Sequence, residues 1–217
     1  MCSWFVRYGA MLEPFSPVRK STARSSSFTM IAPSGCGGMT RVDQIALIGP
    51  GGAGKSTVAA LVADRLGIPC VDLDRRFVER VGDISEYIDR FGYGAYAREN
   101  VETYRLLLEG ETGPRVAALS SGFMTYPNDT HREYPCLRRD LEQSQTTFVL
   151  IPSLNRDCCI AETVRRQMER PFARSRRREE AVIRDRFAFY VGLPVRKIET
   201  LRPLPVVVDE IVMSIPR

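Results

Sequence analysis

The sequence predicts an α/β domain in which short buried strands alternate with helices. The first strand is expected in the apolar run "DQIALIGP" over 43–50, which ends in glycine. A glycine-rich turn follows, and apolar residues then recur at helical spacing as far as Gly67. Later short apolar runs are again separated by helical patterns. This alternation is typical of a parallel sheet with helices on both faces, whose ligands bind beyond the carboxyl ends of the strands.

The remaining elements are assigned in chain order. Strands two to five are expected over 68–74, 115–122, 146–152 and 195–200. Glycines interrupt the helical pattern over 75–108, so two or three helices are expected there. Further helices are expected over 155–169, 175–191 and 205–214, and the first two are rich in arginine. The polar segment 124–145 receives no helix or strand and holds the only histidine, His131, which is placed in a loop.

The first 38 residues differ in composition from the rest of the chain. They are rich in Ser, Gly and Pro, and they contain four basic residues and one acidic residue, which is +3 of the net charge of +5. We expect a disordered leader over 1–38 and one folded domain over 39–217. A transit peptide, a natural tail and an upstream start codon all fit this composition. The nearly balanced charge of the domain argues against a nucleic-acid partner.

The cysteines and the hydropathy bear on the compartment. The six cysteines lack the spacing of metal ligands, and Cys158 and Cys159 are adjacent, which disfavours a disulfide between them. We therefore expect reduced thiols. No apolar run reaches the roughly 18 to 20 residues that a membrane span requires. We expect a cytoplasmic monomer without a membrane partner, with an organelle as the alternative if the leader is a transit peptide.

The turn after the first strand carries a phosphate-binding motif. Residues 49–57, "GPGGAGKST", satisfy G-x-x-x-x-G-K-[ST] between a strand and a helix. Glycines let successive N–H groups point at one anion at the positive end of the helix. Lys55 is expected to reach the β- and γ-phosphates of ATP, and Ser56 to bind Mg2+. The residues predicted to bind the nucleotide are Gly51, Gly52, Ala53, Gly54, Lys55, Ser56 and Thr57.

The second strand ends in two carboxylates, Asp72 and Asp74. Alternation along a strand would put both on one side, at the sheet edge where ligands bind. One acid near a phosphate helps to hold Mg2+, while the other takes the proton of an acceptor hydroxyl. The alternative is a surface pair, with Asp74 capping a helix that begins near Arg75.

The chain resembles the shikimate kinase family of small P-loop kinases. The resemblance rests on "GPGGAGKST", "VDLDRRFVERVGDISEYIDRFGYGAYAREN", "RRQMERPF" and "RDRFAFYVGLPVRKIET", and runs from about Arg41 to the C-terminus with a gap in the middle. It implies a three-layer P-loop kinase fold with a five-stranded parallel sheet and a helical lid. It also implies transfer of the γ-phosphoryl group of ATP to a hydroxyl of shikimate, in aromatic amino acid biosynthesis.

The resemblance implies roles for matching residues. Asp72 would be the acid on the Mg2+ side, and Asp74 the catalytic residue that grips the acceptor. Arg170 would be the lid arginine, and Arg186, four residues before Tyr190, would pair with the acceptor's carboxylate. A guanidinium fork binds a carboxylate at two points, which supports this role independently. The side chain beside the nucleotide is Arg165 or Arg166, with Arg166 the preferred candidate, and Arg98 and Gly122 are further substrate-binding candidates.

Three departures from the family pattern fall on the acceptor side. Three consecutive glycines are replaced by Ser120, Ser121 and Gly122, followed by Phe123. Arg98 stands one position late, which swings a helical side chain by about 100°. The segment 124–145 is more polar than the family's usual segment. Its His131 is interpreted as a surface residue, with a role in an altered acceptor pocket as the alternative.

The leading hypothesis is therefore a kinase of shikimate or a similar carboxylated cyclic polyol. The alternatives are a kinase of a different sugar, polyol or antibiotic hydroxyl, and a nucleotide-binding regulator that has lost phosphotransfer.

Overall fold

The computed structural model describes residues 44–110, 113–169 and 176–216, and within them it contains one five-stranded parallel sheet. The leader expected over 1–38 lies outside the described residues. The strands are β1 (Gln44–Ile48), β2 (Cys70–Asp72), β3 (Arg115–Ala118), β4 (Thr147–Ile151) and β5 (Arg196–Glu199). Their order in the sheet is β2-β3-β1-β4-β5, and every pair is parallel. The α/β class and the five parallel strands are confirmed.

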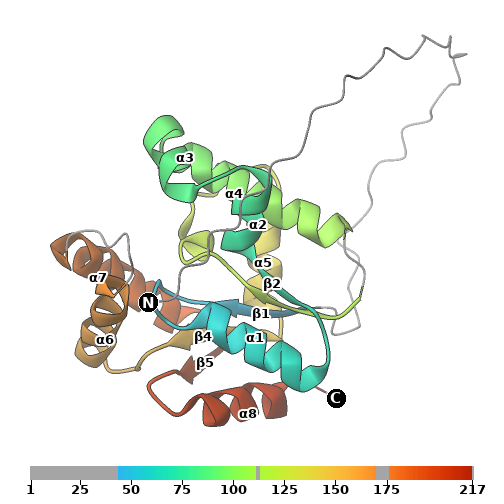
Figure 1. The fold of residues 1–217 in the computed structure, drawn as a ribbon, viewed down its shortest axis with the longest axis vertical. Coiled ribbons are helices and arrows are strands. Elements are labelled where there is room, and N and C mark those ends of the chain that lie inside the picture. Colours follow the sequence, from blue (N-terminus) through green and yellow to red (C-terminus); the bar gives the residue numbers. More distant parts are fainter. Residues whose placement is uncertain (1–43, 111–112, 170–175, 217) are drawn as a thin grey trace, which may run out of the picture. The chain divides into compact units, whose positions relative to one another are not determined.

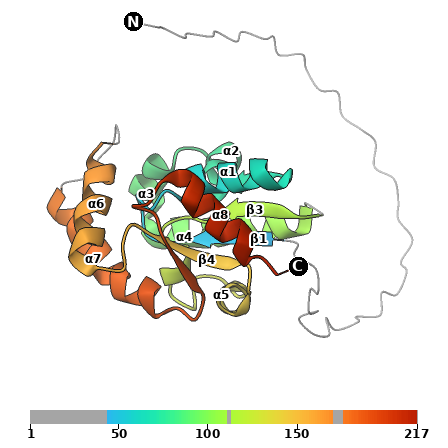
Figure 2. The ribbon, with the colours of Figure 1, turned by 90° about the horizontal axis from the view of Figure 1, so that it is seen from below.

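The central strand β1 separates two apolar layers. Ala46 and Ile48 belong to one buried cluster, whereas Ile45 and Leu47 belong to the other, as the alternation of side chains along a strand requires. Helices α1 (Lys55–Leu66) and α8 (Leu204–Ser214) supply the helical residues of the second cluster. In Figure 2 the strands lie between α1 on one side and α5 on the other, so the sheet is covered on both faces.

The opposite face carries most of the remaining helices. Between β2 and β3 the chain forms three helices, as expected: α2 (Leu73–Arg80), α3 (Ile84–Phe91) and α4 (Tyr93–Gly110). The three-residue helix η1 (Phe123–Thr125) and α5 (Tyr134–Gln143) follow β3. Buried residues of α2, α4, η1 and α5 pack with β1 in one cluster.

Helix α5 lies in segment 124–145, where no helix was expected from the sequence. Only Tyr134 and Leu141 are buried in it, and charged residues lie between them. A helix with so few apolar positions gives little periodic signal. Its place is secured by contacts distant in sequence, including the hydroxyl of Tyr134, which donates to the carbonyl of Phe123 at 2.6 Å.

Helices α6 (Arg156–Met168) and α7 (Arg176–Gly192) lie side by side at one end of the domain (Figures 1 and 2). Ile160, Val164 and Ile183 form a small apolar cluster between them. Residues 170–175, which connect these two helices and which we expected to act as a lid, lie outside the described residues.

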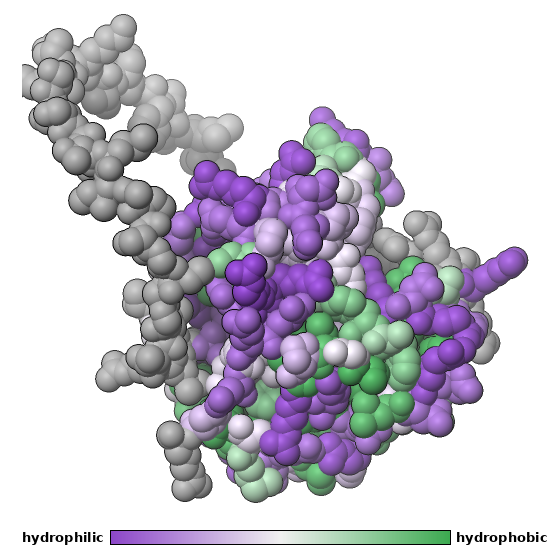
Figure 3. Space-filling model, turned by 180° about the vertical axis from the view of Figure 1, so that it is seen from behind, coloured by the Kyte–Doolittle hydropathy of each residue, from purple (hydrophilic) through white to green (hydrophobic). Residues whose placement is uncertain are grey.

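The surface and the cysteines agree with the composition. On the face in Figure 3, hydrophilic residues dominate the upper part, and hydrophobic residues gather lower down. Among the described cysteines, Cys70, Cys158 and Cys159 form no disulfide. None of the described helices combines the length and the apolar character needed to cross a bilayer.

Candidate active site

The phosphate-binding turn joins β1 to α1. Gly52 and Gly54 have φ angles of 77° and 86°, in the left-handed region that favours glycine. Gly54 is the N-cap residue of α1. No side chain of the described residues forms a capping hydrogen bond at this N-terminus. The N–H groups of the first helical turn, which includes Ser56 and Thr57, therefore point toward the turn. The ammonium of Lys55 folds back and donates to the carbonyls of Gly49 and Pro50, each at 2.9 Å.

The turn is held from outside by α6 and by the end of β5. The guanidinium of Arg166 donates to the carbonyl of Gly52 at 3.2 Å and to the carbonyl of Thr200 at 3.3 Å. The hydroxyl of Thr200 in turn donates to the carbonyl of Ala53 at 3.0 Å. A β-carbon added at Gly51 would lie 2.1 Å from Nε2 of Gln167, so the side chain of Gln167 packs directly on the turn. Sequence reasoning missed Thr200 and Gln167, because only the fold brings them here.

The structure shows which of the two candidate arginines on α6 lies beside the phosphate-binding turn. Arg166 contacts the turn, whereas the side chain of Arg165 is 56% exposed and pairs with Glu162 and Glu169. Glu162 also accepts from Nε of Arg166 at 2.6 Å. Hydrogen bonds first from Arg165 and then from Arg166 lower the pKa of Glu162 to about 2. Glu162 therefore stays ionised at neutral pH and holds Arg166 against the turn.

The two aspartates do not share a strand. β2 ends at Asp72, and α2 begins at Leu73, so Asp74 lies in the first turn of a helix. Asp72 is the N-cap residue, and its carboxylate accepts from the backbone N–H of Arg75 at 3.1 Å. The prediction that alternation along a strand aligns both carboxylates is therefore wrong. The helix starts early because an aspartate N-cap satisfies one of its free N–H groups.

Asp74 nevertheless reaches the end of β3. Its carboxylate accepts a hydrogen bond from the hydroxyl of Ser120 at 2.5 Å. The phenol of Tyr96, on α4, lies in the same group. Burial, and next the charge of Asp74, raise the pKa of Tyr96 far above its usual value, so its hydroxyl stays protonated. Phe123 is fully buried against Tyr104 and other rings, so it points into the core.

Arg186 reaches the same strand end from α7. Its guanidinium donates to the carbonyl of Ser121 at 3.3 Å and to the hydroxyl of Tyr93 at 3.2 Å. Tyr190, one turn further along α7, donates to the same carbonyl at 2.8 Å. A β-carbon added at Gly122 would lie 3.3 Å from Nη2 of Arg186, so this glycine allows the close approach.

The acceptor-side residues lie beside the phosphate-binding turn. Asp74 and Arg186 contact the adjacent residues Ser120 and Ser121, which lie two and three residues beyond the end of β3. β3 is the neighbour of β1, the strand that leads into the turn. A β-carbon added at Gly51 would lie 3.8 Å from Cβ of Ser121, so the two sides meet directly. This juxtaposition puts a carboxylate and a guanidinium beside a triphosphate-binding loop.

Arg98, another predicted site residue, is not brought into this group. Its guanidinium donates to the carbonyl of Thr130 at 3.3 Å. Tyr96 and Asn100, which do face the strand end, are each two residues away, and such a step turns about 200° around a helix. Arg98 therefore projects from the other side of α4. Arg170 lies outside the described residues.

His131, interpreted from the sequence as a surface residue, has a side chain that is only 18% exposed. Its Nε2 lies 3.5 Å from a carboxylate oxygen of Glu102, and its Nδ1 accepts from the backbone N–H of Glu133. Neither contact involves the phosphate-binding turn or the end of β3.

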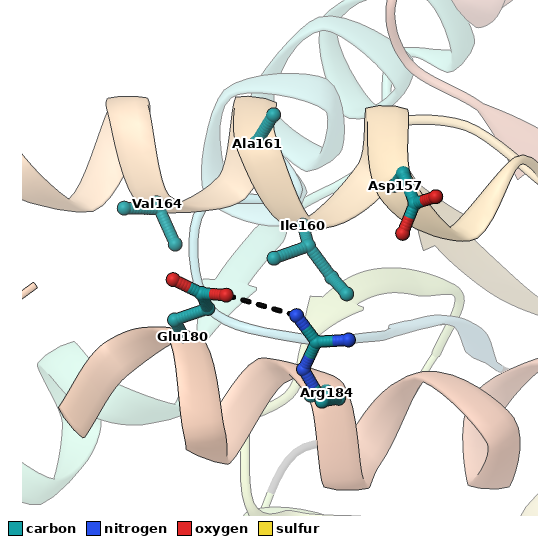
Figure 4. Close-up of a pocket in the computed structure, with 6 residues that line it drawn as sticks. All are labelled: Asp157, Ile160, Ala161, Val164, Glu180 and Arg184. Atoms are coloured by element: carbon teal, nitrogen blue, oxygen red, sulfur yellow. Dashed lines mark hydrogen bonds and ion pairs between the residues drawn. The ribbon is translucent and has the colours of Figure 1, made fainter. Parts of the chain in front are cut away.

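A pocket of about 230 Å³ lies elsewhere, between α6 and α7 (Figure 4). Glu180 and Arg184 form an ion pair at 2.9 Å on its α7 side, and Ile160 and Val164 line its α6 side. None of its lining residues belongs to the turn or to the group around β3. It therefore contributes nothing to the site described above.

Together, the parallel sheet, the phosphate-binding turn and the acidic and basic groups beside it define an ATP-binding P-loop kinase, a phosphotransferase with an alcohol acceptor. The family model described as shikimate kinase matches residues 51–214. The chain belongs to the shikimate kinase family.

Individual relatives agree with this assignment. The shikimate kinase of Zymomonas mobilis subsp. mobilis is 31% identical over 180 residues, covering 80% of this chain and 93% of that protein. The shikimate kinase of Paracidovorax citrulli is 37% identical over 89 residues, covering 41% of this chain and 49% of that protein. A solved structure, shikimate kinase from Acinetobacter baumannii in complex with shikimate, has a TM-score of 0.62 at 22% identity, covering 79% of this chain and 92% of that chain. This last likeness concerns the fold.

Proposed function

We propose that this protein transfers the γ-phosphoryl group of ATP to a hydroxyl of shikimate. The observation that carries the proposal is the contact between the two halves of the site, where Gly51 of the turn approaches Ser121 at the end of β3. Asp74 and Arg186 are anchored at that strand end. Membership of the family and the name of the solved relative support the choice of acceptor.

The donor side follows from the turn. Its N–H groups and the positive end of α1 would hold the phosphates, and Lys55 would leave the carbonyls of Gly49 and Pro50 to pair with them. Arg166 would lie beside the nucleotide, since it already contacts the turn. Water is excluded in kinases by a closing lid, and Arg170 is our candidate for that role.

The chain's oxygen donors fit a magnesium ion bound together with the nucleotide. The described residues contain no group of three or more His, Cys, Asp or Glu side chains able to hold a metal ion. A hard cation that keeps its waters needs only one or two protein oxygens beside substrate phosphates. Ser56, exposed in the first turn of α1, and Asp72 would supply them. When bound, Mg2+ neutralises charge on the phosphates.

The acceptor side supplies a base and an anchor. Asp74 would take the proton of the acceptor hydroxyl as its oxygen bonds to the γ-phosphorus. The bond from that phosphorus to the bridging oxygen breaks at the same time, and ADP leaves. Arg186 would hold the acceptor's carboxylate with two parallel hydrogen bonds. Such positioning accounts for much of the rate of phosphoryl transfer, because the protein does little covalent chemistry itself.

A second candidate is a kinase of a different sugar, polyol or antibiotic hydroxyl. The observation that favours it is that side chains occupy the space at the end of β3, where the family pattern has glycines. Ser120 and Tyr96 cluster with Asp74 there, and Arg98 projects elsewhere. Added hydroxyls and one fewer guanidinium would suit an acceptor with fewer negative charges.

An acceptor-dependent ADP assay on the full chain tests both candidates. Shikimate should stimulate ADP release from ATP and Mg2+, and Lys55→Ala should lower turnover by at least about 100-fold, as expected for loss of a group that stabilises transferring charge. ADP release that only another polyol stimulates would favour the second candidate. ATP binding without any acceptor-dependent ADP would support a regulator that has lost phosphotransfer.

A further inference from the structure

A chain of hydrogen bonds runs from the core to Asp74. The hydroxyl of Tyr126 donates to Oδ1 of Asn100 at 3.2 Å, and Nδ2 of Asn100 donates to Oγ of Ser120 at 3.0 Å. The hydroxyl of Ser120 then donates to Oδ1 of Asp74 at 2.5 Å. The four side chains come from four different segments, namely the loop after η1, helix α4, the turn after β3, and helix α2.

The direction of these hydrogen bonds is determined by the chemistry of the groups. An ionised carboxylate only accepts, so the single proton of the Ser120 hydroxyl goes to Asp74. The oxygen of Ser120 in turn accepts from the amide N–H of Asn100. The oxygen of that amide takes the proton of Tyr126, whose burial raises the pKa of its phenol well above the usual value. Every group therefore donates toward Asp74.

Building on the proposed function, we infer that Ser120 and Asn100 are positioning residues that fix the Asp74 carboxylate for the acceptor hydroxyl. Asp74 is exposed on the first turn of α2, where an unrestrained carboxylate would rotate among several orientations. Ser120 and Asn100 are 2% and 0% exposed, so their own orientations are held by packing. Ser120, held by Asn100, binds one carboxylate oxygen and leaves the other for the acceptor. A base held in one geometry needs less ordering in the transition state.

A purely structural role accounts for only part of this arrangement. Buried polar groups need partners, and Tyr126, Asn100 and Ser120 do satisfy one another. That need does not explain why the chain ends in a short bond to an exposed carboxylate. It also does not explain why the bond forms beside Ser121, which anchors Arg186. The location favours a role in placing Asp74.

The first test uses Ser120→Ala and Asn100→Leu in the full chain. Each should lower kcat with shikimate by about 10- to 100-fold, the factor that matches a hydrogen bond to a charged group. The KM for ATP should stay within about twofold, because Asp74 acts on the acceptor. Ser144→Ala is the matched control. It also removes a serine hydroxyl, which is bonded to the hydroxyl and the backbone N–H of Thr146 at 3.0 and 3.2 Å. Ser144 precedes β4 and therefore lies at the amino ends of the strands, away from the site. Its kcat should stay within about twofold of wild type.

The double variant tests whether the two residues act in series. If Asn100 acts through Ser120, the double variant should be no slower than the slower single variant. If the fold-losses in kcat of the two single variants multiply in the double variant, the two residues act independently, and this result would overturn the inference. A fall in kcat for Ser120→Ala no larger than for Ser144→Ala, at equal Tm, would also overturn it.

Crystal structures of the wild type and of Ser120→Ala separate this inference from the proposed function. The Asp74 carboxylate should occupy one orientation in the wild type and turn from it in the variant. An unchanged carboxylate overturns the positioning role whatever the acceptor is. Absence of shikimate-dependent ADP in the wild type overturns the proposed acceptor alone, because the orientation of Asp74 does not depend on the substrate supplied.

Discussion

The substitution Gly122→Ala should impair the acceptor side of the site while leaving the fold intact. The backbone of Gly122 has a φ of −97°, which alanine adopts without strain. The added methyl group would, however, lie 2.3 Å from the hydroxyl oxygen of Tyr93 and 3.2 Å from a ring carbon of Tyr126. Tyr126 is buried, whereas Tyr93 is 43% exposed, so Tyr93 is the side chain that moves.

The expected size of the effect follows from this displacement. The hydroxyl of Tyr93 must retreat by about 1 Å to reach ordinary contact, which breaks its 3.2 Å hydrogen bond from Arg186. Because the bond involves a charged but partly exposed group, its loss costs about 1 to 2 kcal/mol. This corresponds to a fall of about 5- to 30-fold in kcat/KM for shikimate. The free energy of unfolding should fall by only about 1 kcal/mol, or roughly 2 to 4 °C in Tm, because the crowded neighbour is exposed.

Steady-state ADP release, with shikimate varied at saturating ATP and then ATP varied at saturating shikimate, measures the effect. Gly192→Ala is the matched control, since it lies on the same helix as Arg186 and its added β-carbon would meet nothing within 4 Å. An unchanged kcat/KM for shikimate in Gly122→Ala, or an equal fall in kcat/KM for ATP, would refute the reasoning.

Three further predictions concern charged residues. Arg186→Leu should raise the KM for shikimate by about 10- to 100-fold through loss of a charge-assisted pair, and an equal rise in the KM for ATP would contradict this pairing. Arg166→Leu should raise the KM for ATP by about tenfold, whereas Arg165→Leu, which removes an arginine bonded to the same glutamate but not to the turn, should not. Hydrogen bonds chiefly from Arg165 lower the pKa of Glu162 to about 2. The ionised Glu162 carboxylate therefore stabilises the folded state fully above about pH 5, and this contribution is lost as the pH falls toward 2. Thermal melts of Glu162→Gln should therefore show a deficit in Tm at pH 7 that shrinks below pH 5, and a deficit independent of pH would be inconsistent with it.

The site was only partly predictable from the sequence. The phosphate-binding turn was recognisable because its residues are contiguous and their types follow from local backbone geometry. Arg166 and Thr200 converge on this turn from segments more than 100 residues away in the chain, and a linear pattern does not reveal such a contact. Arg98 was an acceptor candidate from the family resemblance, although it stands one position late, and its direction around α4 became clear only when Tyr96 and Asn100 were seen to face β3.

The sequence by itself determined the parallel α/β class, the order of the five strands along the chain, and the loop that binds phosphate, since each depends on local periodicity or on consecutive residues. Tertiary structure decided which groups share the end of β3. An aspartate from α2 and an arginine from α7 become neighbours there only because parallel strands bring their carboxyl ends to one edge. The physical reason is that side-chain direction depends on where a helix starts and how it packs, and these are settled by capping and burial across the whole domain.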